Sequence, residues 1–593
     1  MSVTATIQSA VITALSQMYS QAFSAKDFQI NRTKPEFEGD YTVVLFSLLK
    51  PLKQSPGALG NALGTCLTEN DPSLFSAFNV IKGFLNLSIT NSYWGGVLNN
   101  NYRNEAYGRK AKNGKTIVVE YASPNTNKPL HLGHLRNIFL GWSVAEILMA
   151  EGYNVIKTCI ANDRGIHICK SMVAWQKFAN GATPESTGIK GDHFVGDYYV
   201  RFGTAYKKEI QELTAGGMPE AEAEKEAPIM KAAQQMLVHW EAGDPEVIAL
   251  WKKMNGWVYA GFDITYRRIG SDFDKIYYES DTYLLGKKLV EEGLRKAVFY
   301  KKEDNSVWVD LTADGLDEKI VQRKDGTAVY ITQDIGLAVE KYEAYHYDQS
   351  IYVVGDEQNY HFKVLQLICR KLGLPSSEGI YHLSYGMVEL PSGRMKTREG
   401  TVVDADDIMD EMVKVAAQKT EELGKVKDFT PEELDKLYNT IGLGALKFFI
   451  LRVDPKKRMI FNPEESIDFH GFTASFVQFS HARAKAILRN EQPDPHFSPQ
   501  YSEALLPLEK ELIILLEKYP AVIRQAAFEH NPSVVVNYCY ELAKTFNSFV
   551  TEHRVLKAET ENKKQLRLRI CRMTANVIAS GMALAGIEVP ERM

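Results

Sequence analysis

The sequence predicts an α/β protein whose central domain is a doubly wound, mainly parallel sheet, with a small N-terminal α/β domain and a C-terminal helical bundle. Two observations in the middle of the chain predict the central domain. Short β-branched or aromatic runs alternate there with helical segments, and a stretch rich in Ala, Glu and Lys at about 172–270 interrupts them. A third observation is that strand signals nearly vanish after about residue 462. A chain of 593 residues is long enough for roughly four domains.

The predicted N-terminal domain covers residues 1–110. Apolar residues recur at helical spacing over 7–23, which predicts an amphipathic helix at the start of the chain. A turn at 37–41 is predicted to lead into an apolar helix, and 83–89 is typical of a strand. The polar stretch 99–113 predicts a linker, because it has few large aliphatic residues and many Asn, Lys and Arg residues.

The predicted central domain covers residues 111–460. It opens with a β-branched strand at 117–119, followed by a loop and by a long helix that begins near His134. Further runs have the composition of strands and are predicted for the same sheet: Val307–Val309, Val329–Ile331 and Ile351–Val354. We expect the interrupting stretch 172–270 to be a largely helical insertion.

The predicted C-terminal domain covers residues 461–593 and is a helical bundle. Its apolar residues follow helical spacing in four segments: 476–488, 505–516, 534–549 and 566–584. Residues 441–593 hold 20 Lys plus Arg and 17 Asp plus Glu, so 20 − 17 gives a local charge of +3. This excess permits RNA binding without requiring it.

Composition excludes several classes of protein. Apolar residues make up 45% of the chain, charged residues 24% and aromatic residues 11%, which are values of ordinary globular proteins and not of disordered or fibrous ones. The net charge of −5 provides no overall attraction to nucleic acid or an acidic membrane. The six cysteines form no Cys-x-x-Cys pair, so we expect reduced thiols. With no basic leader and no bilayer-length apolar run, we expect a cytoplasmic protein without a membrane partner.

The strongest local signal joins the first central strand to the following helix. It runs from Glu120 through Lys128 to His134. Unpaired N–H groups and the dipole at a helix N-terminus favour bound phosphate. His131 and His134 can both donate to phosphate oxygens, and Gly133 lets a flat purine approach the backbone. The segment therefore predicts a nucleotide clamp.

Two alternatives stay open for this pair of histidines. Taken alone, His-x-x-His indicates a structural pair or a metal pair about as often as catalysis. A zinc site needs three or four ligands, and the nearby Asp163 and His167 complete no established zinc arrangement. We therefore favour a nucleotide over a metal and expect no tightly bound, protein-ligated metal.

The segment His131–His134 resembles the HIGH signature of class I aminoacyl-tRNA synthetases, and its flanks resemble arginyl-tRNA synthetases in particular. A later stretch, Arg394–Gly400, resembles the KMSK-like loop of these enzymes, although Thr397 stands in place of the second lysine. In family members that lack this lysine, a lysine just before HIGH is thought to replace it, and the resemblance implies this role for Lys128. A loop of this composition is otherwise a solvated basic turn.

The resemblance implies a role for each of these residues. His131, His134, Lys128, Lys396 and Arg398 would be catalytic, and ATP would contact His131, Gly133, His134, Met395, Lys396 and Thr397. Arginine would be bound by Glu120, Ser123, Asn125, Tyr330, Asp334 and Gln358, with Glu120 and Asp334 on the guanidinium. A planar, five-donor guanidinium is best met by paired carboxylate oxygens. Lysine would leave those oxygens unpaired, so no editing domain is required.

Two of these carboxylates also have simpler explanations. Segments 330–336 and 354–362 are predicted to follow strand ends, where open α/β sheets bind ligands. In isolation, however, we would favour a helix N-cap for Asp334 and a solvated position on an edge strand for Glu120.

The ends of the chain resemble the same family. Residues 461–593 resemble its anticodon-binding bundle, and residues 1–110 resemble its added domain, which contacts the outer corner of the tRNA. Four aromatic residues are candidates for stacking on unpaired bases: Tyr538, Tyr540, Phe546 and Phe549. Aromatic residues at helical spacing more often belong to a core.

The resemblance therefore implies a Rossmann-like catalytic domain and an arginine–tRNA ligase. Such an enzyme uses ATP with Mg²⁺ to convert L-arginine to arginyl-adenylate, and then transfers arginine to the 3′-terminal adenosine of tRNA(Arg). We expect a monomer. The alternatives are another HIGH-type class I synthetase or nucleotidyltransferase, and a synthetase paralogue that binds tRNA without catalysis.

Overall fold

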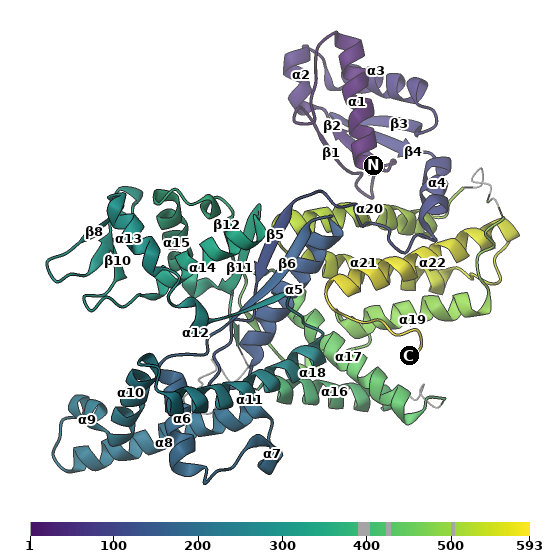
Figure 1. Cartoon of the computed structure of the whole chain (residues 1–593). Coiled ribbons are helices and arrows are strands. Elements are labelled where there is room, and N and C mark those ends of the chain that lie inside the picture. The colour runs from purple at the N-terminus through teal and green to yellow at the C-terminus, as the bar shows by residue number, and fades with distance from the viewer. Residues whose placement is uncertain (1, 390–403, 423–427, 498, 500–503) are drawn as a thin grey trace.

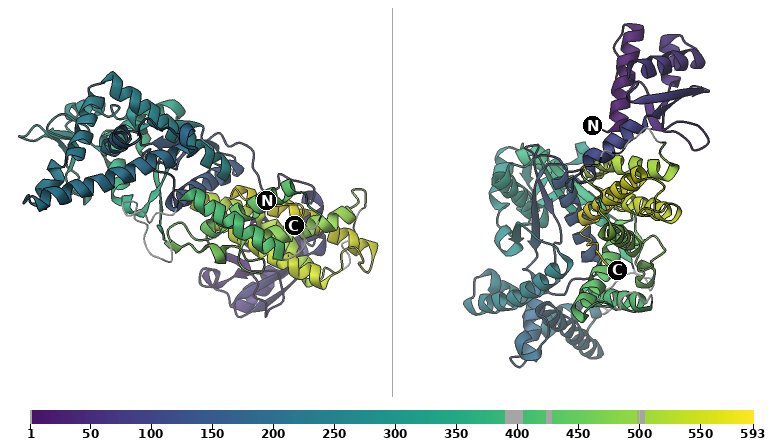
Figure 2. Two further views of the ribbon diagram at one scale, coloured as in Figure 1. Left: turned by 90° about the horizontal axis from the view of Figure 1, so that it is seen from below. Right: turned by 90° about the vertical axis from the view of Figure 1, so that its right-hand side faces the viewer.

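A computed structural model of the chain describes residues 2–389, 404–422, 428–497, 499 and 504–593. Figure 1 shows the N-terminal domain above a central α/β region, a helical insertion at the lower left and a helical bundle at the right. The N-terminal domain and the insertion lie at opposite ends of the molecule in Figure 1 and in the right-hand view of Figure 2. The predicted fold class is therefore confirmed.

The central sheet has five parallel strands in the order β12-β11-β5-β6-β7. Their bounds are Thr116–Glu120 for β5, Asn154–Ala161 for β6, Lys275–Tyr278 for β7, Gln349–Gly355 for β11 and Ile380–Tyr385 for β12. The chain moves outward from β5 to β7 and then returns to the other side of β5 with β11 and β12. The strand order thus reverses between β5 and β11, which is where doubly wound sheets bind their ligands.

Two predicted strands do not belong to this sheet. Val307–Val309 is β9, which lies between β8 (Phe299–Lys301) and β10 (Lys319–Gln322) in a separate antiparallel sheet. The strand prediction for 329–331 is wrong, because Tyr330 begins helix α14 (Tyr330–Tyr345). Ile331, Ile335 and Ala338 are buried at near-helical spacing, so the apolar face of the longer segment outweighs the β-branched composition of three residues.

Helix α5 (Leu132–Ala150) connects the sheet to the C-terminal half of the chain. Nearly all of its residues are buried, because it packs on the sheet and also against α17 (Pro431–Leu451) and α20 (Pro507–Glu529). At the left of Figure 1, helices α14 and α15 (Asn359–Lys371) lie beside strands β11 and β12. Helix α5 therefore lies between the sheet and helices of the C-terminal half.

The interruption between β6 and β7 is entirely helical over its described elements, as predicted. Its helices are α6 (Ile166–Phe178), α7 (Pro184–Thr187), α8 (Gly191–Ala215), α9 (Glu220–Glu226), α10 (Pro228–Glu241) and α11 (Pro245–Ile269). Helices α8 and α11 approach closely at Gly191, where an added Cβ would lie 2.0 Å from the Trp257 carbonyl oxygen. The start of α8 is therefore tightly held against α11.

The N-terminal domain is an antiparallel sheet covered by helices. Its strands, in the order β1-β2-β4-β3, are β1 (Gln29–Arg32), β2 (Tyr41–Val44), β3 (Phe75–Ile81) and β4 (Phe84–Ile89). Its helices are α1 (Val3–Tyr19), α2 (Phe46–Leu52), α3 (Pro56–Asn70) and α4 (Asn91–Asn101). The first helix ends earlier than predicted, at Tyr19, and the turn at 37–41 leads into β2 before the chain reaches α2.

The C-terminal bundle confirms the four predicted helices. Besides α20 it contains α19 (Ala474–Asn490), α21 (Ser533–Glu552) and α22 (Glu561–Leu584). Tyr538, Phe546 and Phe549 are buried in its core, which confirms the core explanation for these three. Tyr540 is half-buried against the rings of Phe472 and Phe476.

The remaining short elements connect these parts. They are α12 (Glu279–Thr282), α13 (Lys287–Arg295), α16 (Ala405–Glu422), α18 (Pro463–Ser466), β13 (Val388–Glu389), β14 (Met459–Ile460), and three 3₁₀ turns, η1 (Thr312–Asp314), η2 (Asp356–Gln358) and η3 (Pro375–Ser377). The six cysteines are unpaired, five of them buried, as expected for reduced thiols. Within the described ranges, every helix falls short of the length or apolarity that membrane crossing requires.

Candidate active site

Two histidine rings accept backbone hydrogen bonds at the start of α5. His131 is the N-cap residue, and its Nδ1 accepts a hydrogen bond of 3.1 Å from the Gly133 amide. The His131 amide donates at 3.1 Å to Nδ1 of His134, and the two ring centroids are 3.9 Å apart. Because each Nδ1 accepts a bond, the neutral rings carry their proton on Nε2. That N–H is the group each ring can offer to a phosphate oxygen.

Burial keeps both imidazoles uncharged. It lowers the pKa of His131 to about 3 and the pKa of His134 well below its usual value, and the positive charge of Lys128 lowers both further. Burial also lowers the pKa of Lys128. The rings therefore act as neutral donors, and the helix N-terminus and Lys128 attract the anion.

Gly133 is required by the ring that caps the helix. A Cβ on Gly133 would lie 2.9 Å from Cε1 of His131, so any side chain here would displace that ring. The sequence predicts this glycine as a contact for a purine, and the structure adds that it makes room for His131. Within His131–His134, the glycine therefore allows the first histidine to cap the helix.

The loop between β5 and α5 is conformationally strained. Ala122 and Ser123 have φ values of 79° and 43°, which non-glycine residues adopt at a cost of about 1–3 kcal/mol each. Asn137 on α5 stabilises this loop, because its Oδ1 accepts from the Ala122 amide at 2.6 Å and its Nδ2 donates to the Val353 carbonyl at 2.7 Å. Ser123, a predicted arginine contact, is half-buried in this strained loop.

Glu120 ends the middle strand of the sheet and is buried. Its Oε2 accepts from Nζ of Lys341, a fully buried ammonium that also lies 4.5 Å from the ring centroid of Tyr352. Glu120 is therefore not a solvated residue on an edge strand. Its charge is already compensated by Lys341, which sequence reasoning missed because 221 residues separate the partners.

The other predicted arginine contacts lie on helices and turns. Asp334 lies within the second turn of α14, so it is neither an N-cap nor at a strand end, and its Oδ2 is 2.6 Å from Nε2 of His361. Tyr330 begins α14 and is 73% exposed. Gln358 is exposed at the end of η2, directly after β11, as the prediction for 354–362 requires.

A cavity of about 810 Å³ opens beside these residues. Asn125 and Tyr330 both line it, so the structure brings these two predicted contacts together. Glu120, Asp334 and Gln358 do not line this cavity. Burial raises the pKa of Tyr352, and the negative charges of Glu120 and Asp334 raise it further.

Glu279 is a third carboxylate, which sequence reasoning missed. It directly follows β7, begins α12 and lines the cavity. Burial raises its pKa to about 7, Asp163 and Asp334 add to the rise, and Arg164 opposes it. A cation in the cavity would favour its charged form. Its position after a parallel strand is the signal that could have identified it.

Arg164 supplies a cation to the wall of the same cavity. Its guanidinium carbon lies 4.0 Å from the ring centroid of Tyr283, and its Nη2 is 3.1 Å from Glu241. Nearby, both carboxylate oxygens of Asp163 accept bonds from Ser280 or Tyr259 at 2.7–2.8 Å. Protein donors thus occupy the carboxylate considered for a metal site, which argues for a structural role of Asp163.

Four predicted residues cannot be placed. Met395, Lys396, Thr397 and Arg398 lie outside the described residues. The other predicted site residues, which are the two histidines, Gly133, Lys128 and the arginine contacts, lie within the described residues.

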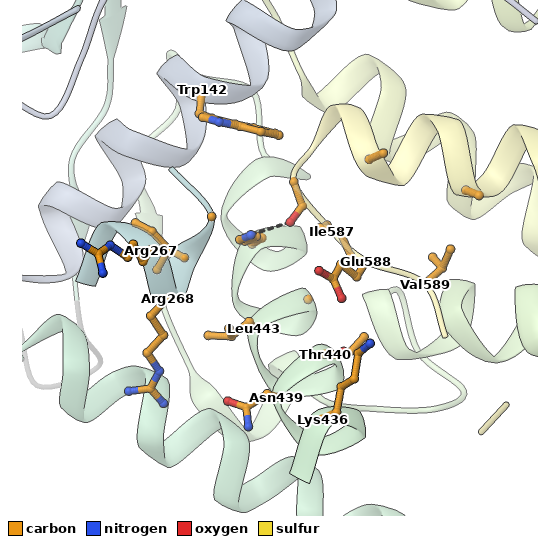
Figure 3. A pocket seen from close by; sticks show the side chains of 17 residues that line it. Trp142, Arg267, Arg268, Lys436, Asn439, Thr440, Leu443, Ile587, Glu588 and Val589 are labelled. Atoms are coloured by element: carbon orange, nitrogen blue, oxygen red, sulfur yellow. Dashed lines mark hydrogen bonds between the residues drawn. The ribbon is translucent and has the colours of Figure 1, made fainter. Parts of the chain in front are cut away.

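A second cavity, of about 700 Å³, lies where α5, α11, α17 and the C-terminal segment meet (Figure 3). Trp142 projects into it from α5, and Arg267 and Arg268 approach it from α11. Nζ of Lys447 donates to the Gly586 carbonyl, and burial lowers the pKa of Lys447 to about 8. None of the predicted site residues that the structure describes lines this cavity, which separates it from the described part of the candidate active site.

Three family models match successive parts of the chain. The model for the catalytic domain of class I tRNA synthetases (R) matches residues 97–462. The model for the arginyl tRNA synthetase N-terminal domain matches 5–89, and that for the DALR anticodon binding domain matches 477–593.

Curated relatives and solved structures resemble the whole chain. The arginine–tRNA ligase of Bacteroides thetaiotaomicron is 53% identical over 98% of both chains, and that of Flavobacterium psychrophilum is 52% identical over 100% of both. The structure of Thermus thermophilus arginyl-tRNA synthetase has a TM-score of 0.80 at 24% identity and covers 99% of each chain. The Plasmodium falciparum enzyme has a TM-score of 0.76 at 16% identity, covering 100% of this chain and 99% of its own.

Proposed function

This chain belongs to the class I arginyl-tRNA synthetase family, and from that premise we propose how its residues carry out arginine–tRNA ligation. Its activity is that of an ATP-dependent arginine–tRNA ligase. The observation that carries the assignment of the site is the pair of neutral imidazoles at the start of α5, the helix that follows the middle strand β5 where the strand order reverses.

In the first step an arginine carboxylate oxygen attacks the α-phosphorus of ATP. The new O–P bond forms as the bond from the α-phosphorus to the pyrophosphate oxygen breaks, and Mg²⁺ accompanies ATP as part of the substrate. Nε2–H of His131 and of His134 would donate to phosphate oxygens as charge accumulates on them. Lys128 adds positive charge beside them, and Lys396 and Arg398 are proposed to assist.

In the second step the arginyl group moves to the 3′-terminal adenosine of tRNA(Arg). By family resemblance the 2′-hydroxyl oxygen attacks the arginyl carbonyl carbon and loses its proton, and AMP leaves with the electrons of the broken bond. The protein acts mainly by orienting the reactants, which is sufficient for large rate effects in such transfers.

The amino-acid side of the site is proposed to bind arginine. Asp334 is the predicted contact best able to meet a guanidinium, because its carboxylate is partly exposed beside His361, whereas the Glu120 carboxylate is buried against the Lys341 ammonium. Glu120 and Lys341 would then form a pair without net charge at the end of β5, beneath the arginine site. Ser123, Asn125, Tyr330 and Gln358 remain the proposed contacts to the rest of the substrate.

We also propose how the chain is organised. Residues 1–110 would contact the tRNA corner, 111–460 would catalyse both steps, with the insertion at 172–270, and 461–593 would bind the anticodon. The DALR match supports the last assignment. The protein is proposed to act as a monomer in the cytoplasm, where its substrates are found.

One assay tests this function directly. Exchange of radiolabelled pyrophosphate into ATP is measured with each of the twenty amino acids, with and without total tRNA. We expect arginine to give the signal and lysine to give none. A signal with another amino acid and none with arginine would refute the specificity. Tight tRNA binding without exchange or aminoacylation would instead indicate a silent paralogue.

A further inference from the structure

A partly buried ionic cluster lies outside the residues assigned above. Nζ of Lys190, the N-cap residue of α8, donates to Asp192 at 3.0 Å, to Thr265 at 2.6 Å and to Asp406 at 2.6 Å. Nε2 of His193 lies 3.1 Å from Oδ2 of Asp406. The cluster therefore joins two helices of the insertion, α8 and α11, to the first turn of α16.

Asp404 connects this cluster to the signature. Its Oδ2 lies 3.4 Å from Nε2 of His193, and its Oδ1 accepts from the Asp406 amide at 2.7 Å. The backbone of Asp404 forms an antiparallel bridge with His131. In addition, the Ala405 amide donates to the Leu130 carbonyl at 3.0 Å. The segment that enters α5 is thus paired with a segment whose acidic side chains the insertion holds.

A second contact joins α8 to the same segment. A Cβ added to Gly196, about one turn beyond His193 on α8, would lie 2.8 Å from Cδ of Pro129. The backbone of α8 therefore packs directly on the residues between Lys128 and His131. Behind it, an added Cβ on Gly261 of α11 would lie 2.3 Å from Oδ1 of Asp192. The start of α8 cannot shift without moving one of these neighbours.

The charge balance of the cluster argues against a metal ion. Asp192, His193 and Asp406 place their ligand atoms close enough for a cation. The Lys190 ammonium, however, already contacts the Oδ2 atoms of both aspartates. The bond to Asp406 also raises the pKa of His193, which favours the imidazolium. Protein cations thus neutralise these carboxylates.

We propose that Lys190 and His193 are positioning residues, which hold His131 in its reactive place through Asp406 and Asp404. This inference depends on the proposed function and gives the helical insertion a role in it. Neither residue contacts the substrates in this arrangement. Their loss would shift the N-cap of α5, and displacements of about 1 Å at a reacting centre can lower rates by about 10²-fold.

The test compares Lys190→Met and His193→Ala with the wild-type protein in arginine-dependent pyrophosphate exchange with tRNA present. We expect kcat to fall about tenfold or more in each variant, while KM for arginine changes by less than about twofold. Lys190→Arg and His193→Gln keep a donor to Asp406 and are expected to recover most of the rate. Lys208→Met is the matched control, because Lys208 is an exposed residue on the same helix, paired with Glu212.

Three kinetic results would overturn the proposal. The first is a kcat within twofold of wild type in both Lys190→Met and His193→Ala. The second is a defect that appears in KM for arginine instead of kcat. The third is a kcat for Lys190→Arg and His193→Gln that is no higher than for Lys190→Met and His193→Ala. Circular dichroism spectra restrict the comparison to folded variants, and the rescue variants keep the test decisive if Lys190→Met does not fold. Binding of Mn²⁺ by the wild type that Asp192→Asn abolishes would equally contradict it. Wild-type exchange with arginine tests the proposed function separately.

Discussion

The two sides of the candidate active site are built in opposite ways. On the phosphate side, His131 and His134 come from seven consecutive residues that begin at Lys128, and both rings are uncharged donors. On the arginine side, Glu120, Glu279 and Asp334 come from β5, α12 and α14. The phosphate side thus depends on local backbone geometry, and the arginine side on charges brought together by folding.

This difference predicts how each side fails when it is altered. Loss of a local donor should reduce the rate of chemistry while the fold persists. Loss of a buried charge should affect stability or arginine binding, because an unpaired charge in the interior is costly. The following four predictions test the contrast, from the largest expected effect to the smallest.

Lys341→Met should destabilise the fold by about 3–5 kcal/mol, because it leaves the buried Glu120 carboxylate without its partner. Urea unfolding measures the change, and Lys208→Met on the exposed surface should have little effect. The double variant Lys341→Met with Glu120→Gln should recover most of the loss. A single variant as stable as wild type would show that the pair is not buried as described.

His134→Asn should lower kcat of arginine activation about 10²–10³-fold with little change in stability. Asparagine can still accept the bond from the His131 amide through Oδ1, but it lacks the outer Nε2–H. Pyrophosphate exchange and urea unfolding are measured on the same preparation. A fall of less than tenfold would mean that the ring serves only as part of the helix cap.

Asp334→Asn should raise KM for arginine about 10–100-fold and leave KM for ATP nearly unchanged, because the charge match to the guanidinium is lost. Glu343→Gln removes a charge from an exposed position of the same helix and is the matched control. The assigned role is wrong if both KM values rise together, or if Glu343→Gln has the same effect.

The apparent affinity for arginine should rise about tenfold between pH 6 and pH 8. Glu279 has a raised pKa of about 7, so it is largely protonated at pH 6, and a bound cation favours its charged form. Calorimetric titration of arginine across this range should also show proton release on binding near neutral pH. Glu279→Gln should remove the pH dependence of the affinity for arginine. If that pH dependence persists in the variant, a group other than Glu279 causes it.

The helices and the phosphate side could largely be predicted from the sequence. The four bundle helices follow from the helical spacing of their apolar residues, and the strand at 117–119 follows from its run of β-branched residues. The strand predicted at 329–331 failed because three residues cannot show whether a longer apolar face follows. Val307–Val309 was correctly predicted as a strand, but its partners are β8 and β10, and composition carries no information about strand pairing.

By itself, the sequence determined the parts whose partners lie within a few residues. Examples are the His131 ring, which caps α5, and the hydrogen bond from the His131 amide to Nδ1 of His134. Only the tertiary structure decided that Lys341 neutralises Glu120, that Glu279 joins the cavity, and that Lys190 is joined to Asp406. The physical reason is that a charge becomes costly, or useful, only once burial has removed water around it. Burial at these positions depends on chain segments far apart in the sequence.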